Sequence, residues 1–398
     1  MHAAATAKLL QALGAEGAEV RFVGGCVRDW LAGRPVGDLD LATSAAPEEN
    51  MRLLAAAGLK AVPTGIAHGT VTAIVQGQPY EVTTLRRDVE TFGRHARVAY
   101  TDDWTADARR RDFTINALYA DADGSIYDPC GGLADLERGR VRFVGRAAAR
   151  IAEDRLRILR FFRFHAWYGQ GRANRSALIA CWHAAPEIAL LSGERIRNEL
   201  LRLLSAPEPR PALRLMLRHG VMRHLLSDGG DIGALTRLMR AEAPDQTSSL
   251  RRLAALMRGA GRAAALGLAE RLRLSNADRD RLVLLVEHGR EVDRKADRRR
   301  LRRAIYAYGP DAVVDLALLA GAPELARRAR SESLPRFPLK GRDALKFGVA
   351  AGPEIGLLLD KVERWWIAGD FRPARAACLA RLETLAKQRR RGAVSSRP

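Results

Sequence analysis

The sequence contains few cysteines, and their positions form no recognisable metal or disulfide motif. Four are scattered through the 398 residues without a Cys-x-x-Cys pair, namely Cys26, Cys130, Cys181 and Cys378. This spacing excludes a small disulfide-stabilised scaffold and argues against a structural zinc site. Such a protein suits a reducing compartment, and we expect it in the cytoplasm.

Long hydrophobic runs are also missing. No run of about 18 uncharged apolar residues, the length that a membrane-spanning helix needs, occurs in the chain. The opening residues MHAAATAKLLQALGAEGAEV lack an apolar stretch of the length found in signal peptides. We therefore expect a soluble protein that is not exported and has no membrane partner.

Negative charge is scarce relative to positive charge. Lys and Arg number 66 against 46 Asp and Glu, which leaves a net charge of +20 and favours a polyanionic partner such as nucleic acid. Arginine is much commoner than lysine, and its guanidinium suits bidentate phosphate binding, although a GC-rich genome would also enrich arginine. Hydrophobic residues at 47% indicate a globular chain, and the length allows two or three domains.

Short apolar runs separated by turns fill the first third of the chain. Between Arg21 and about Arg140, segments such as RFVGG, GDLDLAT and TVTAIVQGQPYEVTTL are predicted to be strands. Gln76-Gly77-Gln78-Pro79 is predicted to form a hairpin turn. From about Ala147 almost to the C-terminus, apolar residues recur at helical spacing instead.

Two aspartates one residue apart stand out in GDLDLAT. If this segment is a strand, Asp38 and Asp40 point to the same face, where two carboxylates can hold Mg²⁺ while phosphate oxygens and water complete its coordination. Glu81, on a neighbouring predicted strand, could add a third carboxylate. Alone, such a pair more often decorates an exposed strand end.

The segment before this pair changes the assessment. Gly24 and Gly25 follow an apolar pair and precede VRDWLAG, which is predicted to be a short helix. A glycine turn here can bring backbone N–H groups against a phosphate, and Arg28 can add a charge-assisted contact. A glycine pair alone more often marks a tight turn. Followed shortly by Asp-x-Asp, it predicts a nucleotide site with a metal ion.

The whole segment GGCVRDWLAGRPVGDLDLAT resembles the signature of polymerase β-type nucleotidyltransferases, in their class II branch of CCA-adding enzymes and bacterial poly(A) polymerases. Four later segments resemble, in order, the family's nucleotide motif, its head-to-neck motif, its base-selecting helix and the motif that braces this helix. They are RRDFTINALY (110–119), DPCGGLADL (128–136), EDRLRILRFFRF (153–164) and SGERIRNEL (192–200). The resemblance covers about the first half of the chain.

This resemblance implies an α+β fold, in which a polymerase β-like head with a small mixed sheet is followed by an all-α neck, body and tail. We place the head at 1–140, the neck at 141–205, the body at 206–330 and the tail, with a basic C-terminal end, at 331–398. Prolines predict joints near 207–211 and within 331–341.

The family reaction is attack of an RNA 3′-hydroxyl on the α-phosphate of a nucleoside triphosphate, with release of pyrophosphate. By resemblance, Asp38 and Asp40 are catalytic and hold Mg²⁺, with Glu81 as a further candidate ligand. Asp112 is either a contact on the ribose side or a structural partner of the neighbouring arginines, and we favour the structural role. The implied nucleotide contacts are Gly25, Arg28, Arg111, Asp154, Arg157, Arg160 and Arg163.

The base-selecting segment carries a prediction about side-chain placement. Four charged residues recur every three positions and are predicted along one face of a single helix, namely Asp154, Arg157, Arg160 and Arg163. In an arbitrary helix, Asp154 and Arg157 would form an ion pair. The resemblance implies instead that Asp154 accepts from the exocyclic amino group and Arg157 donates to the ring nitrogen, which admits cytosine and adenine and rejects uracil and guanine. Arg160 and Arg163 suit phosphates or helix packing better than bases.

The segment 85–108 is rich in charge and poor in regular pattern, which is typical of a surface loop. The resemblance implies a flexible loop that helps the site change from CTP to ATP, matched by RRD (86–88) and GRHAR (93–97). This favours an enzyme that adds both bases over one that adds only CC or only A.

The helical second half carries less specific chemistry. The stretch 294–309, RKADRRRLRRAIYAYG, could follow a phosphate backbone, although a solvated helix face is the simpler interpretation of any one arginine. The segment 337–371 resembles the tail with which CCA-adding enzymes grip tRNA, and within it Trp365 and Trp366 are expected in the core. No His-Asp dipeptide occurs, so the phosphohydrolase domain of some relatives is not expected.

We therefore predict CCA addition to tRNA from CTP and ATP, without an obligate protein partner. The nearest alternative is a poly(A) polymerase, which shares the head, and an enzyme restricted to CC or to A is a further variant. An RNA-binding protein with an inactive catalytic centre is a different class. The presence of the expected catalytic and base-reading residues argues against it.

Overall fold

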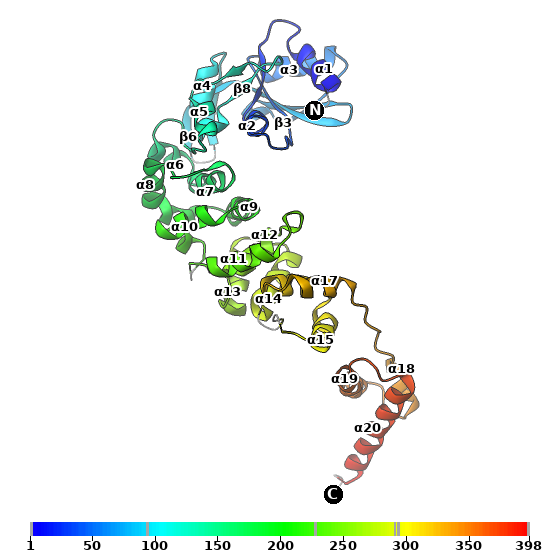
Figure 1. The fold of residues 1–398 in the computed structure, drawn as a ribbon. Coiled ribbons are helices and arrows are strands. Elements are labelled where there is room, and N and C mark those ends of the chain that lie inside the picture. Colours follow the sequence, from blue (N-terminus) through cyan, green and yellow to red (C-terminus); the bar gives the residue numbers. More distant parts are fainter. Residues whose placement is uncertain (1–2, 93–94, 227–228, 290–291, 293–294, 396–398) are drawn as a thin grey trace. The chain divides into compact units, whose positions relative to one another are not determined.

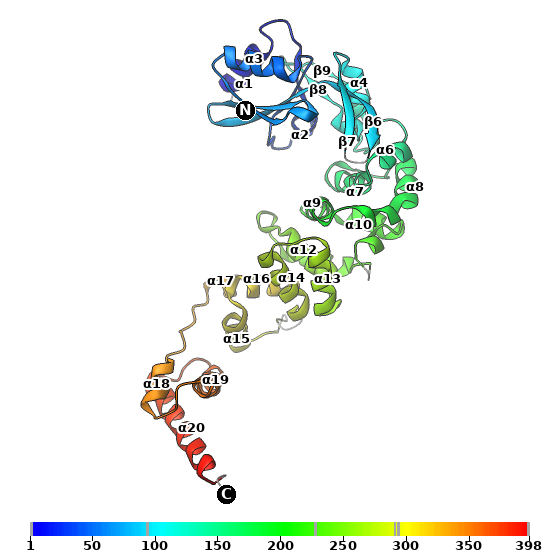
Figure 2. The same ribbon diagram turned by 180° about the vertical axis from the view of Figure 1, so that it is seen from behind.

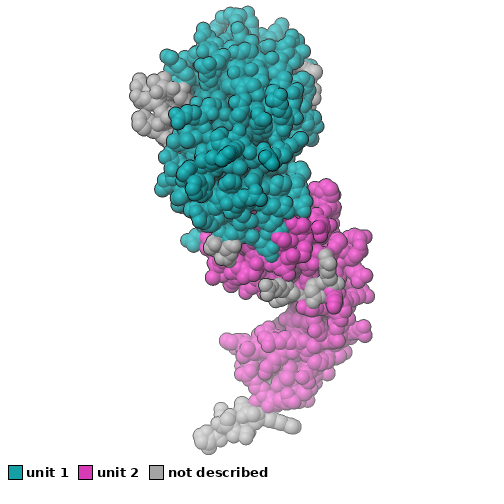
Figure 3. All heavy atoms as spheres, turned by 60° about the vertical axis from the view of Figure 1, so that its left-hand side comes forward, with its two compact units in different colours: residues 1–232, 270–274 teal, residues 233–269, 275–398 magenta. Residues whose placement is uncertain are grey.

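The computed structural model describes residues 3–92, 95–226, 229–289, 292 and 295–395. The chain divides into two compact units (Figure 3). The first comprises residues 1–232 and 270–274, and the second comprises residues 233–269 and 275–398. Among the described residues, no helix combines the length and the apolar character that crossing a bilayer requires.

A mixed sheet of seven strands organises the N-terminal part of the first unit (Figure 1). Its spatial order is β3-β4-β5-β2-β1-β8-β9. The strands are β1 (Val20–Val23), β2 (Asp40–Thr43), β3 (Lys60–Gly65), β4 (Thr70–Val75), β5 (Gln78–Thr84), β8 (Tyr119–Ala120) and β9 (Ile126–Tyr127). β2 and β5 pair in parallel, and the other neighbours are antiparallel. The prediction of a small mixed sheet is confirmed.

The predicted hairpin turn between β4 and β5 is also confirmed. Val75 pairs with Gln78, so the turn proper is Gln76-Gly77, and both residues have positive φ, at 51° and 80°. Positive φ at both central residues matches the right-handed twist of the flanking strands. Pro79 lies within β5 opposite Ile74 instead of in the turn.

Two helices, α1 (Ala3–Leu13) and α3 (Pro47–Ala56), pack on one face of the sheet and build its core. Leu9, Leu54 and Leu41 of β2 are fully buried in this core. Side chains alternate along a strand, so the neighbours of Leu41, Asp40 and Ala42, point to the opposite face. Burial of Leu41 therefore determines on which face the predicted metal ligand Asp40 lies.

β6 (Arg86–Phe92) and β7 (His95–Tyr100) pair as a two-stranded antiparallel sheet, visible beside α4 (Trp104–Arg109) in Figure 2. The prediction of an irregular loop is therefore wrong for the described residues. In the sequence, residues of high β propensity alternate with charged ones at period two, a strand pattern that the high charge obscured. Gly93 and Arg94, which belong to the segment matched to the family's loop, lie outside the described residues.

The remaining regular elements of the first unit are helices, and from Ala147 onward the described elements are helices without strands, as predicted. They are α2 (Gly25–Leu31), η1 (Ile66–His68), η2 (Thr114–Asn116), α5 (Gly132–Glu137), α6 (Ala147–Glu153), α7 (Arg157–Tyr168), α8 (Arg175–Ala184), η3 (Ala185–Leu190), α9 (Gly193–Leu204), α10 (Arg210–Arg218) and η4 (Met222–His224). The prolines at 207–211 lie at the start of α10 inside this unit, because proline is well tolerated in the first helical turn. The chain enters the second unit at residue 233 instead.

The described residues of the second unit are helical. The helices are α11 (Ile232–Ala241), which begins at the boundary, η5 (Pro244–Gln246), α12 (Ser249–Leu256), α13 (Gly261–Arg271), α14 (Asn276–His288), α15 (Arg298–Tyr308), α16 (Pro310–Leu319), α17 (Pro323–Ser331), α18 (Gly341–Lys346), α19 (Pro353–Ala368) and α20 (Arg375–Ser395). No helix or strand lies between α17 and α18, where a joint was predicted, and the boundary of body and tail there stays a prediction. Trp366 is 1% exposed and Trp365 packs against the same cluster, as expected of core residues.

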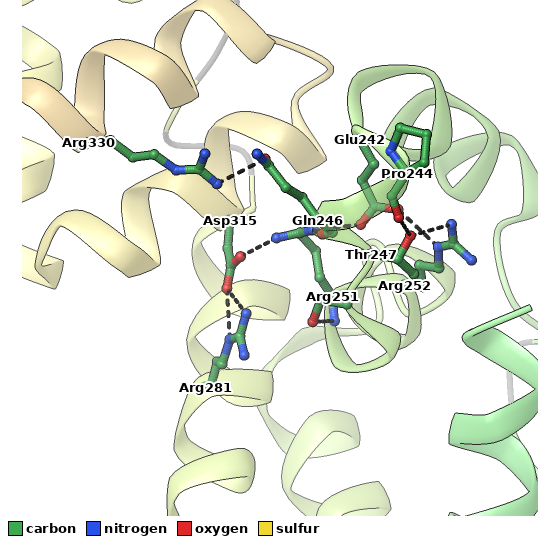
Figure 4. A network of polar contacts seen from close by, with 10 residues as sticks. Glu242, Pro244, Gln246, Thr247, Arg251, Arg252, Arg281, Asp315 and Arg330 are labelled. Carbon is green, nitrogen blue, oxygen red and sulfur yellow. Dashed lines mark hydrogen bonds and ion pairs between the residues drawn. The ribbon is translucent and has the colours of Figure 1, made fainter. Parts of the chain in front are cut away.

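A buried ionic network ties the helices of the second unit together (Figure 4). Arg251 and Arg252 of α12 share the carboxylate of Glu242, at 2.8 and 2.9 Å. Arg251 also contacts Asp315 of α16 at 2.6 Å, and Arg281 of α14 contacts the other oxygen of Asp315 at 2.5 Å. Buried charges persist in a fold only when they are paired and hydrogen-bonded in this way.

Four arginines of α15 also have partners within the second unit. Arg298 and Arg302 pair with Glu332, and Arg302 also contacts Asp370 at 3.2 Å. Arg299 and Arg303 donate to the carbonyl oxygen of Ala368, the last residue of α19. Carbonyl groups at a helix C-terminus lack intrahelical donors, so arginine side chains stabilise them. The basic stretch 294–309 thus serves helix packing at these four positions.

Candidate active site

The glycine turn between β1 and α2 packs against the segment that carries the predicted nucleotide contacts. Gly24 has φ 72° and ψ −116°, a conformation open mainly to glycine. A Cβ atom there would lie 3.4 Å from Nη1 of Arg111 and 3.6 Å from the carbonyl oxygen of Asn116. The Gly24 N–H donates to the carbonyl oxygen of Leu118 at 3.0 Å. The turn predicted from the glycine pair is therefore present, and Gly25 begins α2.

The three predicted metal-binding carboxylates lie near one another but not all on strands as expected. β2 begins at Asp40, so Asp38 lies in the preceding bend, and the argument from strand alternation does not apply to it. Asp38 is exposed and Asp40 is partly buried. Asp40 lies opposite Glu81 in the parallel register of β2 and β5, so these two side chains leave the same face of the sheet.

The negative charges around Asp40 outweigh the positive charge near it. Burial raises the pKa of Asp40 to about 6, with further contributions from the negative charges of Glu81 and then Asp38, while Arg111 opposes the shift. No ion pair within 4 Å involves any of these three carboxylates in the described part of the chain. A cation placed between them would relieve the repulsion.

A divalent cation fits this donor set if part of its coordination comes from outside the protein. Among the described residues, no group of three or more His, Cys, Asp or Glu side chains is placed to hold a metal ion. Glu81 is therefore not gathered with the two aspartates into a complete protein cage. Mg²⁺ typically binds through one or two carboxylates together with substrate phosphates and water. The pair Asp38 and Asp40 matches that mode.

Arg28, predicted on the triphosphate, is buried and held by protein partners. Its Nε and Nη2 donate to the two carboxylate oxygens of Asp29 at 3.0 Å each, and Nη1 donates to Oδ1 of Asn116 at 2.5 Å. The guanidinium carbon lies 4.4 Å from the centre of the Tyr168 ring and 5.1 Å from that of Phe164. These contacts hold the guanidinium in one orientation beside the glycine turn.

Arg111, predicted on the nucleotide, is held by a buried aspartate that the sequence reasoning missed. Nε and Nη2 of Arg111 contact Oδ2 of Asp107 at 3.2 and 2.9 Å, and the Tyr119 hydroxyl donates to the same oxygen at 2.7 Å. Oδ1 of Asp107 accepts from Arg110 and from the backbone N–H of Arg86, the first residue of β6. Burial alone would raise the pKa of Asp107, but Arg111 and Arg110 outweigh it and hold this pKa at about 2.

Asp112 has the structural role that we favoured, but with a different arginine. Its Oδ2 accepts from Arg160 of α7 at 2.6 Å, and Oδ1 accepts from Nδ2 of Asn116 at 3.0 Å. Burial opposes ionisation, yet the charge of Arg160 prevails and the pKa of Asp112 lies below its ordinary value. The arginines next to Asp112 in sequence, Arg110 and Arg111, pair with Asp107 instead.

The prediction that Asp154 shares one helix with the three arginines is wrong. α6 ends at Glu153 with Asp154 as its C-cap, and α7 begins at Arg157. Oδ1 of Asp154 accepts from the N–H of Leu156 at 3.1 Å, so the aspartate occupies the turn between the helices. A short polar side chain favours such a turn over a helix interior because it competes for backbone N–H groups.

The side chains of Asp154 and Arg157 have separate protein partners. Asp154 pairs with Arg195 of α9 at 2.7 Å. Arg157 pairs with Glu153 and donates to the carbonyl oxygen of Arg150 at 2.8 Å. The intrahelical Asp154–Arg157 ion pair that an arbitrary helix would contain is therefore not formed.

Helix α9 braces α7, as its motif predicted. Glu199 contacts Arg163 at 2.5 Å and Arg160 at 3.7 Å, and Nε1 of Trp167 donates to the carbonyl oxygen of Arg202 at 2.8 Å. Arg160 and Arg163 therefore have partners that hold the helix in place, and their contact with the nucleotide stays a prediction. Glu199 was not identified from the sequence, because its partners lie 36 and more residues away.

The sequence contained a signal for one of the missed residues but not for the others. Asp107 lies four residues before Arg111, a spacing at which helical side chains meet. Asn116 and Arg195 contact residues 88 and 41 positions away, and no local pattern indicates such pairs.

Comparisons with known proteins find similarity along most of the chain. The poly(A) polymerase head domain matches residues 20–142, and the probable RNA- and SrmB-binding site of polymerase A matches residues 175–229. The mitochondrial CCA tRNA nucleotidyltransferase 1 of Danio rerio is 35% identical over 376 residues, 92% of this chain and 87% of the relative. The CCA-adding enzyme of Lactobacillus johnsonii is 31% identical, covering 91% and 92%.

Solved structures show the same relationship. The Bacillus stearothermophilus CCA-adding enzyme in complex with CTP has a TM-score of 0.81 and 28% identity, covering 98% of both chains. The Thermotoga maritima CCA-adding enzyme complexed with tRNA shares the fold, with a TM-score of 0.65 and 20% identity over 95% of this chain and 94% of that one.

Proposed function

The chain belongs to the CCA-adding tRNA nucleotidyltransferase family, and we infer that it adds CCA to the 3′ end of tRNA from CTP and ATP without a nucleic-acid template. The observation that carries this conclusion is similarity along almost the whole chain. The two family models named for polymerase A match residues 20–142 and 175–229, whereas the relatives from Danio rerio and Lactobacillus johnsonii, which are named for CCA addition, match about nine-tenths of the chain.

We propose that Asp38 and Asp40 hold the metal ion, and that this ion is Mg²⁺. When bound, a divalent cation activates the attacking 3′-oxygen and neutralises charge on the leaving phosphates. The chain's own contribution is the carboxylate pair, whose repulsion is relieved by a cation. The negative charge of Glu81, on the neighbouring strand β5, helps to raise the pKa of Asp40.

We assign Gly25, Arg28 and Arg111 to the nucleotide. The guanidinium of an arginine carries five N–H donors. Nε, Nη1 and Nη2 of Arg28 each use one of them on Asp29 or Asn116. One donor on Nη1 and one on Nη2 thus have no partner among the described residues. An ideal Cβ at Gly25 would lie 3.8 Å from Nη2, which places the free donors beside the glycine turn.

We assign base selection to Asp154 and Arg157. Arg195 and the backbone N–H of Leu156 use one lone pair on each oxygen of Asp154, and each carboxylate oxygen has a second. An amino group of cytosine or adenine can therefore be accepted while Arg195 keeps the carboxylate in place. Only Nη1 of Arg157 is engaged among the described residues, so its remaining donors can reach a ring nitrogen.

The other assignments follow from the family. We place the catalytic head at 1–140, the base-selecting neck at 141–205, the body at 206–330 and the tRNA-binding tail at 331–398. Cytoplasmic localisation is likewise proposed.

The reaction is tested with tRNA transcripts that end before the CCA sequence. The purified protein is incubated with Mg²⁺ and each labelled nucleotide, and products are resolved at single-nucleotide length. We expect two cytidylates followed by one adenylate, and no product with UTP or GTP. A long adenylate run on any RNA would instead identify a poly(A) polymerase, and addition of CC or A alone would identify a partial enzyme.

The base assignment is tested with Asp154→Ala. Loss of the acceptor for the amino group should relax discrimination against UTP by about tenfold, since one hydrogen bond to a charged group contributes about 1.5 kcal/mol. Unchanged discrimination would overturn the assignment.

A further inference from the structure

Helix α7 and the glycine turn are joined by a closed ring of polar contacts. The contacts begin at Arg160 in the first turn of α7 and continue through the segment after Arg111 and through α2. They end at Tyr168, the last residue of α7, so the helix itself closes the ring. Its members, in order, are Arg160, Asp112, Asn116, Arg28, Asp29 and Tyr168.

In the first half of the ring, the side-chain amide of Asn116 lies between the carboxylate of Asp112 and the guanidinium of Arg28. Asp112 accepts from Arg160 at 2.6 Å and from Nδ2 of Asn116 at 3.0 Å, and Oδ1 of Asn116 accepts from Nη1 of Arg28 at 2.5 Å. A carboxylate only accepts and a guanidinium only donates. The amide of Asn116 therefore satisfies both neighbours in one orientation only.

The second half of the ring closes on the C-terminal end of α7. Asp29 accepts two parallel hydrogen bonds from Arg28 at 3.0 Å, and the Tyr168 hydroxyl donates to Oδ1 of the same carboxylate. The Tyr168 ring also covers the guanidinium of Arg28, at 4.4 Å. Tyr168 thus touches Arg28 directly and also holds the carboxylate that orients it.

We propose that Asn116 and Tyr168 are positioning residues that hold Arg28 ready for the triphosphate and couple it to the base-reading helix α7. This inference rests on the proposed function, in which Arg28 contacts the triphosphate. An arginine loses side-chain entropy when it is ordered by a ligand, and a side chain already ordered by the fold avoids that cost on binding. Because both ends of the ring lie on α7, the triphosphate contact and the base-reading segment keep one relative position.

The coupling is tested by binding of CTP and of CMP, which lacks the β- and γ-phosphates. Tyr168→Phe removes only the hydroxyl that supports Asp29. We expect CTP to bind about three- to tenfold more weakly, the loss of one hydrogen bond, while CMP binding is unchanged. Asn116→Ala is the second variant, with the same expected selectivity for CTP. Equal weakening of both nucleotides, or of neither, would overturn the positioning role.

Tyr127→Phe is a matched control. The Tyr127 hydroxyl also makes a hydrogen bond, to Thr105 at 3.0 Å, and its ring also lies near an arginine, Arg21, at 4.9 Å. Arg21 pairs with Asp121 and Glu19 and is not assigned to the nucleotide. Tyr127→Phe should leave the ratio of CTP to CMP affinity unchanged. A fall equal to that of Tyr168→Phe would mean that the effect is a general consequence of losing a buried hydroxyl.

Arg28→Met separates failure of this inference from failure of the proposed function. If Arg28→Met does not lower the ratio of CTP to CMP affinity, the assignment of Arg28 to the triphosphate is wrong, and the inference falls with it. If Arg28→Met lowers the ratio but Tyr168→Phe and Asn116→Ala do not, the assignment stands and only the positioning role is wrong. Thermal unfolding of each variant establishes that the protein measured is folded.

Discussion

Two groups of carboxylates, one in each unit of the molecule, differ in whether arginine pairs with them. In the second unit, Glu242 and Asp315 are buried and each is shared between two arginines (Figure 4). In the first unit, Asp38, Asp40 and Glu81 lie near one another, and no ion pair with a basic side chain is present for them among the described residues. Arginine is abundant in the chain as a whole, so a shortage of arginine does not explain why Asp38, Asp40 and Glu81 have no ion pair.

The difference separates charges that build the fold from charges available to a ligand. A buried carboxylate with two arginine partners has no capacity for a cation, and removing it leaves unpaired positive charge in the interior. A partly buried carboxylate without an ion-pair partner is destabilised until a cation binds. Burial, followed by the charges of Glu81 and Asp38, raises the pKa of Asp40 to about 6, although Arg111 opposes the shift. Four predictions would break or sharpen this comparison.

The largest effect is expected for activity when the unpaired site is changed. Asp40→Asn keeps the size of the side chain but removes its charge, so incorporation of CTP should fall by at least about a thousandfold, since metal-assisted charge stabilisation contributes several kcal/mol. Single-nucleotide extension of a tRNA transcript measures this. Asp123→Asn, at an exposed turn in the same part of the chain, is the control and should retain full activity. Normal turnover by Asp40→Asn would remove the metal assignment.

A change at the paired site should lower stability and leave activity almost unchanged. Asp315→Asn leaves Arg251 and Arg281 without their carboxylate, and we expect the free energy of unfolding to fall by about 3 kcal/mol. Urea unfolding followed by circular dichroism measures the change. Activity per folded molecule at low temperature should stay within about twofold of the wild type. Asp311→Asn, exposed in the first turn of the same helix, is the matched control and should change neither quantity. A stable Asp315→Asn variant would contradict a structural role for the network.

A smaller effect is expected when Asp40→Asn is measured for stability instead of activity. The pKa of Asp40 determines at which pH the substitution stabilises the protein. The pKa of Asp40 is about 6 in the folded state and about 3.9 when unfolded, so between these values the folded state binds more protons. The stability of the folded state therefore falls as pH rises from about 4 through 6, and the loss is nearly complete at about pH 7. With metal chelated, Asp40→Asn should gain about 1 to 2 kcal/mol at pH 7.5 and nothing near pH 4. A loss of stability at pH 7.5 would contradict the raised pKa of Asp40.

The smallest effect is expected where a charge pair is exposed. Arg52 contacts Glu49 and Glu16, and all three side chains are open to solvent. Water and salt screen such pairs, so Arg52→Gln should leave the unfolding midpoint unchanged within measurement error. A clear shift would show that exposure does not separate the structural pairs of this protein from its incidental ones.

Local patterns in the sequence predicted much of the fold. The Gln76-Gly77 turn, the α2 helix after Gly24 and the change to helices near Ala147 follow from turn chemistry and periodicity, and the structure contains all three. The sheet of β6 and β7 was missed because its dense charge obscured a strand pattern. The helix break at Asp154 was missed because spacing of three residues is compatible with one helix or with two separated by a turn.

By itself, the sequence determined the order of strands and helices, the carboxylate pair at Asp38 and Asp40 and the basic character of the chain. Only the tertiary structure decided which charges are already paired. Arg28 meets Asn116 and Arg160 meets Asp112 across 88 and 48 residues. Chain periodicity describes neighbours within one element, whereas these partners meet only after different elements pack. For the same reason, only the folded structure shows that Asp40 has no ion-pair partner among the described residues.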